Sequence, residues 1–150
     1  SLRSSIRRHL EQFPAVATGL SRTERQTLAA LTGGPLTPRE LFPAANPAVE
    51  EAVFMGDWGW WSHIRPLAVA GRPLIRVEGQ VPEAWHHADW WGDDESAPGV
   101  VLTAGGVGVL DGTLDHAAVN GLDRWLGGVH LHGPGPLWRW DETTGTVVVM

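Results

Sequence analysis

Apolar residues at the start of the chain recur every three or four positions, which predicts a helix with one apolar face. That face comprises Leu2, Ile6, Leu10 and Phe13. Pro14 should end the helix, because proline lacks the N–H group that another turn would use. We therefore expect residues 1–19 to form a helix and a linker.

Two capping boxes predict the next two helices. In Ser21–Glu24 and in Thr37–Glu40, a hydroxyl residue precedes a glutamate by three positions, so each side chain can accept the other's backbone N–H. The Gly33–Gly34 pair should end the first helix, and Pro38 suits the first position of the second. A brief helical turn should follow between residues 46 and 54.

The stretch DWGWWSHIRPLAVAG predicts a longer helix that Asp57 caps and Gly71 ends. Its core-facing side chains should be Trp58, Trp61, Ile64 and either Leu67 or Ala68. Trp60, His63 and Arg65 should point outward. The alternation that follows, at 73–79, and the apolar run 99–102 predict a hairpin with a long polar tip.

The stretches VHLH, LWRWD and TVVV predict an antiparallel meander with turns at Gly133–Pro136 and Glu142–Gly145. The first turn would pair His130 with Arg139. The second would pair Asp141 with Thr146, Trp140 with Val147 and Trp138 with Val149. This register collects an apolar face of Val129, Leu131, Trp138, Trp140, Val147 and Val149. The face turned to water would hold His130, His132, Arg139, Asp141 and Thr146.

This order of elements is typical of a winged helix-turn-helix core followed by a small C-terminal antiparallel β-meander, an α+β fold. GLSRTERQTLAALTGGPLTPRELF resembles the first two helices of that fold, and VVLTAGGVGVLDG resembles the exit from its wing. We place the winged-helix domain at 20–118, its long wing loop at 79–98 and the meander at 119–150.

A narrower resemblance rests on GDWGWWSHIRPLA, NGLDRWLGGVHL and WRWD. These stretches make the chain similar to the C-terminal region of uncharacterised bacterial proteins that carry a conserved domain of unknown function at their N-terminus. The resemblance implies no activity and no site residues. Together with a first residue other than Met, it leads us to expect a domain taken from a larger protein.

Charge and composition narrow the classes of partner. The net charge is −6, and no basic residue lies between Arg76 and Arg124, which disfavours nucleic acid as a general partner. The chain has no Cys, which excludes thiolate catalysis and thiolate zinc sites. No run approaches the ~20 apolar residues of a membrane helix. We expect a cytoplasmic protein without a cofactor, whose nine Trp fill the core or line a surface for a partner.

Three sets of residues are candidates for a site. An interaction surface would use Trp60, His63, Arg65, Trp85, Trp90 and Trp91. Contacts to phosphate would use Arg22, Arg25, Arg39 and Arg65. A metal site in the wing loop would use His86, His87, Asp89 and Asp93, since imidazole with carboxylate suits zinc. The simpler interpretation of that loop is an acidic segment whose carboxylates point apart into water.

The pair His130 and His132 could supply two zinc ligands, but a zinc site uses at least three protein ligands and the neighbouring sequence shows no third. We interpret both as water-facing side chains of a half-exposed sheet. NGLDRWLGG, with its neighbours Asp123 and Arg124, should be a structural corner before the meander.

These patterns favour a non-catalytic interaction domain that contacts a protein partner or its own N-terminal domain. No assembled set of nucleophile, acid and base is visible in the sequence. Two alternatives stay open: a DNA-binding transcriptional regulator, and a metal-dependent enzyme that uses the His/Asp-rich loop.

Overall fold

The computed structural model describes residues 1–79 and 98–150. The described chain forms two compact units: one combines Ser1–Arg22 with Gly108–Met150, and the other is Thr23–Val107. The predicted loop residues Trp85, His86, His87, Asp89, Trp90, Trp91 and Asp93 lie outside the described residues. None of the helices in the described ranges is long and apolar enough to cross a membrane.

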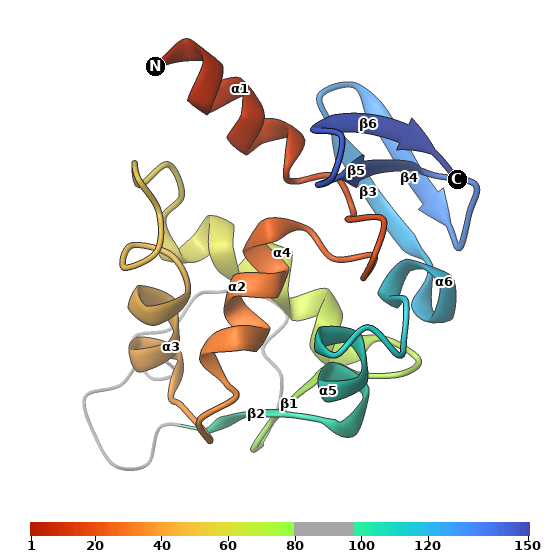
Figure 1. Cartoon of the computed structure of the whole chain (residues 1–150). Coiled ribbons are helices and arrows are strands. Elements are labelled where there is room, and N and C mark those ends of the chain that lie inside the picture. The colour runs from red at the N-terminus through yellow and green to blue at the C-terminus, as the bar shows by residue number, and fades with distance from the viewer. Residues whose placement is uncertain (80–97) are drawn as a thin grey trace. The chain divides into compact units, whose positions relative to one another are not determined.

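The elements mix helices with small antiparallel hairpins, which is an α+β fold (Figure 1). The helices are α1 (Leu2–Leu10), α2 (Arg22–Ala30), α3 (Pro38–Ala45), α4 (Asp57–Val69), α5 (Ala104–Leu110) and α6 (His116–Asn120). The strands are β1 (Ile75–Val77), β2 (Val100–Leu102), β3 (Leu122–Leu126), β4 (Val129–Gly133), β5 (Trp138–Asp141) and β6 (Thr146–Val149).

Residues close in sequence determine several elements of the Thr23–Val107 unit. The predicted capping box begins α3: the Glu40 N–H donates to Oγ1 of Thr37, and the Thr37 N–H donates to a Glu40 carboxylate oxygen at 2.9 Å. The predicted hairpin forms as well, with Arg76 opposite Val101. Leu36 exchanges two backbone hydrogen bonds with Val100, so the segment before α3 runs beside β2.

The predicted helical turn between residues 46 and 54 is shorter than expected. Asn46 ends α3 with φ −130° and ψ −78°, outside helical geometry. A single turn follows, in which the N–H groups of Val49 and Glu50 both donate to the Asn46 carbonyl at 3.1 Å, and residues 51–56 have no regular structure.

The predicted inward face of α4 is correct at Trp61, Ile64 and Leu67 and wrong at its start. Trp60, expected to point outward, is fully buried, whereas Trp58 is 60% exposed. The Trp60 indole N–H donates to Oγ1 of Thr27 at 3.0 Å, and its ring lies 5.5 Å from that of Phe42. Because its polar edge has a buried partner, Trp60 can enter the core without leaving an unmet hydrogen bond.

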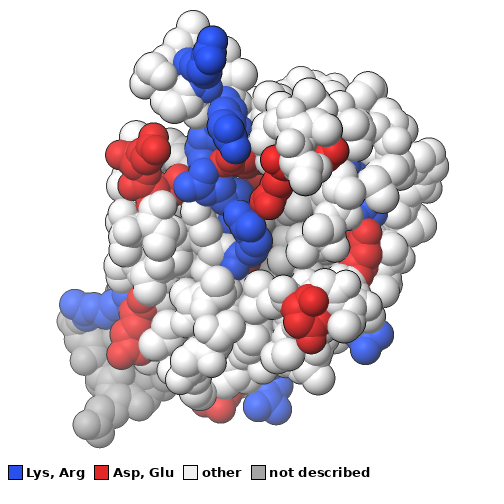
Figure 2. Space-filling model, in the orientation of Figure 1, with Lys and Arg blue, Asp and Glu red and all other residues white. Residues whose placement is uncertain are grey.

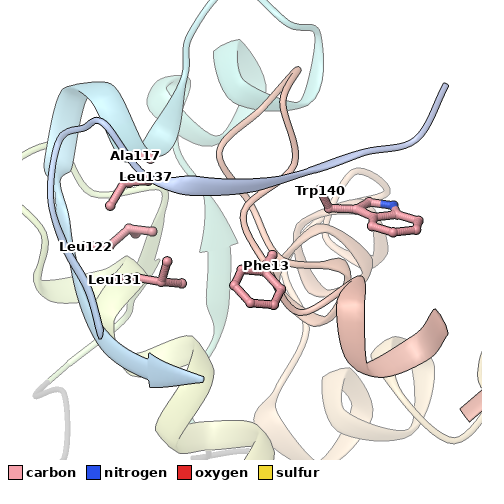
Figure 3. Close-up of a cluster of buried hydrophobic side chains, with 6 residues drawn as sticks. All are labelled: Phe13, Ala117, Leu122, Leu131, Leu137 and Trp140. Carbon is pink, nitrogen blue, oxygen red and sulfur yellow. The ribbon is translucent and has the colours of Figure 1, made fainter. Parts of the chain in front are cut away.

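The other unit is organised around one apolar cluster (Figure 3). Its buried members are Phe13, Ala117, Leu122, Leu131, Leu137 and Trp140. They come from the segment after α1, from α6 and from both C-terminal hairpins. Backbone hydrogen bonds hold the first of these segments against β5, from Trp140 N–H to the Pro14 carbonyl and from Val16 N–H to the Trp140 carbonyl. Burial of this cluster supplies the main stabilisation of the unit.

The predicted meander is half right. β5 and β6 pair in the predicted register, with Asp141 opposite Thr146 and Trp140 opposite Val147. β4 instead pairs with β3, which places Trp125 opposite His130. The reason is the Gly127–Gly128 turn, where φ values of 53° and 83° suit the two-residue hairpin loop that glycine favours.

The predicted two faces of β5 and β6 also need correction. Arg139, expected in water, is 3% exposed, and Trp138 and Val149, expected in the core, are 46% and 54% exposed. The Arg139 guanidinium forms an ion pair with Asp115, from Nη1 to Oδ2 at 2.6 Å. The other oxygen of Asp115 caps α6 by accepting the Ala118 N–H.

Candidate functional site

An exposed apolar surface lies between α3 and the first turn of α4. It comprises Val49, Val53, Phe54 and Trp58, whose exposed fractions are 47%, 59%, 52% and 60%. We call these four residues the 49–58 surface. The first three belong to the segment that joins α3 to α4 in Figure 1, and Trp58 belongs to the first turn of α4. Apolar side chains are normally exposed singly, so four within ten residues mark a place where another surface can pack.

The backbone at the start of α4 explains why Trp58 stays outside. Gly56 precedes the helix in an extended conformation and caps it without a side-chain bond. The Asp57 carboxylate accepts the Trp58 N–H at 2.9 Å, which holds the first turn. With Trp60 and Trp61 buried, the direction of Trp58 on the helix is set away from the core.

The charges around the 49–58 surface are acidic. Glu50, Glu51 and Asp57 lie within it in sequence, and no basic residue occurs between Arg39 and Arg65. Figure 2 shows acidic side chains gathered over this part of the molecule. Acidic residues are therefore interspersed along the sequence with the apolar residues of this surface.

The predicted interaction residues of α4 are only partly available. Trp60 is buried, as described above. His63 is half-buried, and its Nδ1 donates to the Gly59 carbonyl at 2.8 Å, one turn back along the helix. Arg65 is also half-buried and interacts within the chain.

The arginines that were predicted to contact phosphate interact with other groups of the same chain. Arg22 forms an ion pair with Glu11, from Nη1 to Oε2 at 2.6 Å, and Glu11 also accepts a hydrogen bond from Arg7. Burial raises the pKa of Glu11, but the hydrogen bonds and charges of Arg22 and Arg7 together outweigh it and keep that pKa below its ordinary value. Arg25, Arg39 and Arg65 also interact within the chain.

Of the described residues, Asp123, His130 and His132 form the group that could hold a metal ion. All three are exposed on the β3–β4 hairpin. Nε2 of His130 donates to Oδ1 of Asp123 at 2.7 Å. That hydrogen bond is the largest of the causes that hold the pKa of Asp123 below its usual value.

Sequence reasoning missed both Asp123 and Trp58. A signal for the first was present: Gly127–Gly128 is a two-residue hairpin turn, and a hairpin closed there places Asp123 across from His132. A signal for Trp58 was also present: with 3.6 residues per turn, the apolar residues at 60, 61, 64 and 67 share about one third of the circumference of α4, and Trp58 lies outside that face.

Comparisons with protein-family models, with curated proteins and with solved structures give no match to this chain.

Proposed function

We propose that this chain is a protein-interaction domain that docks a partner protein on the 49–58 surface. The exposure of Val53, Phe54 and Trp58, which are close in sequence, carries the proposal. Phe and Trp are the residues that an interface core favours, and Trp is among those that lose most binding energy when truncated.

The partner we propose presents an apolar ridge flanked by Lys or Arg side chains. Glu50, Glu51 and Asp57 give the segment that carries the surface a negative charge. A basic rim on the partner would match this charge, speed association and disfavour acidic competitors such as nucleic acid. An N-terminal domain of the same protein that carries such a ridge would meet the same description.

Two observations support a winged-helix arrangement of the Thr23–Val107 unit as the scaffold for this surface. The unit runs α2, α3, α4 and then the β1–β2 hairpin, in the order of that fold. Leu36 bonds to Val100 beside that hairpin, where a winged helix has its short first strand. In this scaffold, α4 takes the place of the recognition helix and presents Trp58 at its start.

Photo-crosslinking at position 58 tests the proposal. A photoreactive phenylalanine analogue replaces Trp58 in one variant and Trp138, which is exposed in the other unit, in the control. We expect position 58, and not position 138, to crosslink one defined protein in an extract of the source cells. That protein is then purified and titrated calorimetrically against the wild-type chain.

Substitution at the surface decides the outcome. Trp58→Asp should weaken binding of the purified partner by about 30-fold, the effect of losing a residue at the centre of an interface, whereas Trp138→Asp should leave it unchanged. Equal binding by both variants, crosslinking to nucleic acid, or a partner that lacks basic residues around the contact would overturn the proposal.

A further inference from the structure

The register of the β3–β4 hairpin brings four side chains together on its outer face. Asp123 stands opposite His132, and Trp125 stands opposite His130. Opposed residues in an antiparallel pair have Cβ atoms ~4.5–5.5 Å apart, and residues two apart on one strand share a face. Imidazole, carboxylate and indole groups therefore lie side by side.

The inner face of the same hairpin fixes its backbone. Leu122 and Leu131 are buried in the apolar cluster of Figure 3, and Leu126 and Val129 pack against it. The Gly127–Gly128 turn closes the two strands. The positions of the outer side chains are thus set by the folded core, which reduces the ordering cost of binding an ion.

The potential ligand atoms already form a group close to the size of a coordination shell. Oδ1 of Asp123 lies 2.7 Å from Nε2 of His130 and 3.7 Å from Nδ1 of His132. One ligand atom from each residue lies within 4.8 Å of the other two. Ligands that hold zinc at ~2.0–2.2 Å in tetrahedral geometry lie roughly 3.3 Å apart, so small rotations of exposed side chains close the shell.

Trp125 orients one of these ligands. Its ring stacks on the imidazole of His130, with centroids 4.5 Å apart and an angle of 4° between the planes. This stacking holds the plane of His130 while Nε2 faces Asp123. The neighbouring His132 ring lies 5.2 Å from that of His130, tilted by 36°.

We infer that Asp123, His130 and His132 bind a zinc ion, with water completing the coordination. Two imidazole nitrogens and one carboxylate oxygen suit zinc, whereas Mg²⁺ and Ca²⁺ take oxygen ligands. Three protein ligands on an exposed face leave at least one coordination position open to water or to a ligand from outside the chain. This site is independent of the 49–58 surface, which belongs to the other unit.

Calorimetric titration of zinc chloride into the chelator-treated chain tests the inference. We expect one zinc ion to bind at this site with a dissociation constant on the order of micromolar. This affinity is weaker than that of structural zinc sites with four protein ligands. His132→Ala and Asp123→Asn should each weaken this binding at least about tenfold. Both residues are exposed, so these variants should fold as the wild type does, which the thermal unfolding midpoint without metal will show.

A matched control removes the histidines of the predicted loop. The double variant His86→Ala with His87→Ala should keep the site and its affinity. Zinc should also change the NMR chemical shifts of the imidazole nitrogens of His130 and His132 in both the wild type and this control. Loss of all binding in the double variant, unchanged binding in His132→Ala and Asp123→Asn, or no heat of binding at millimolar zinc would overturn the inference.

Discussion

The two C-terminal hairpins look alike in sequence and differ in what covers their polar side chains. In β3–β4, His130 and His132 are exposed beside Asp123. In β5–β6, Arg139 occupies a comparable alternating position, yet it is 3% exposed and paired with Asp115. The sequence predicted that His130, His132 and Arg139 all face water, and Arg139 does not.

The difference shows that alternation separates the two faces of a strand without saying what packs on each. Arg139 is covered by groups far away in sequence: it bonds to Asp115, 24 residues earlier, and its Nη1 lies 3.4 Å from the Ala15 carbonyl oxygen. No distant segment supplies a partner of that kind to the Asp123–His130 pair in the hydrogen bonds of the described residues. The Arg139–Asp115 pair therefore contributes to folding, whereas the Asp123–His130 pair remains exposed to a ligand.

Removal of the Arg139 charge should lower the free energy of unfolding more than any other change considered below. Arg139→Met leaves Asp115 without its ion-pair partner, and loss of one member of a buried pair costs about 3 kcal/mol of unfolding free energy. Urea denaturation at neutral pH measures this cost. In the double variant with Asp115→Asn, part of the stability should return, since no lone charge remains. A cost below about 1 kcal/mol in Arg139→Met would show that the pair behaves as a solvated one.

Neighbouring residues of β4 should differ sharply in their effect on stability. Leu131 is 1% exposed in the apolar cluster, so Leu131→Ala should cost about 2–3 kcal/mol through lost burial and a cavity. His132→Ala, one residue further along, should change the unfolding free energy by less than about 0.5 kcal/mol in the absence of metal. Paired urea titrations compare the two. Equal costs would mean that both faces of the hairpin are packed.

Zinc should stabilise the chain through one hairpin and not the other. At a free zinc concentration 100 times the dissociation constant, binding to the folded state alone adds about 2.7 kcal/mol. Thermal unfolding with and without zinc chloride should show this gain in the wild type and in Asp141→Asn, which alters the β5–β6 turn. The gain should be much smaller in His132→Ala. An equal gain in all three proteins would place the zinc elsewhere.

The parts of the fold that the sequence predicts are those decided by near neighbours. The Thr37–Glu40 capping box and the β5–β6 register each depend on residues within a dozen positions. The β4 pairing was predicted wrongly because two glycine-containing turns compete for that strand. The Gly127–Gly128 turn forms a compact hairpin, whereas the loop at Gly133–Pro136 holds two prolines that cannot donate backbone hydrogen bonds.

The candidate sites were harder to predict, because exposure depends on packing across the whole unit. On α4, steps of three residues linked Trp58 to Trp61, although each such step turns the helix face by about 60° and carries Trp58 away from the buried side. The Thr27 hydroxyl that receives the Trp60 indole is 33 residues away. Asp123 becomes a neighbour of His132 only after β3 is recognised as a strand. The ligand set was therefore present in the sequence, but its third member needed the correct register.

The Asp141→Asn substitution in the turn of the β5–β6 hairpin should have the smallest effect on stability, and this effect should depend on pH. The carboxylate of Asp141 accepts hydrogen bonds from the side chain and the backbone N–H of Thr143, and these hold the pKa of Asp141 below its usual value. A lowered pKa in the folded state means that the stabilisation is complete above the unfolded-state pKa of about 3.9 and is lost as pH falls through the folded value. The unfolding midpoint of the wild type should exceed that of Asp141→Asn by a constant amount at pH 5 to 7, and the gap should close toward pH 3. A gap that stays constant down to pH 3 would show that the carboxylate charge does not stabilise this turn. The β3–β4 turn has glycine at both loop positions, so its stability does not depend on such a carboxylate.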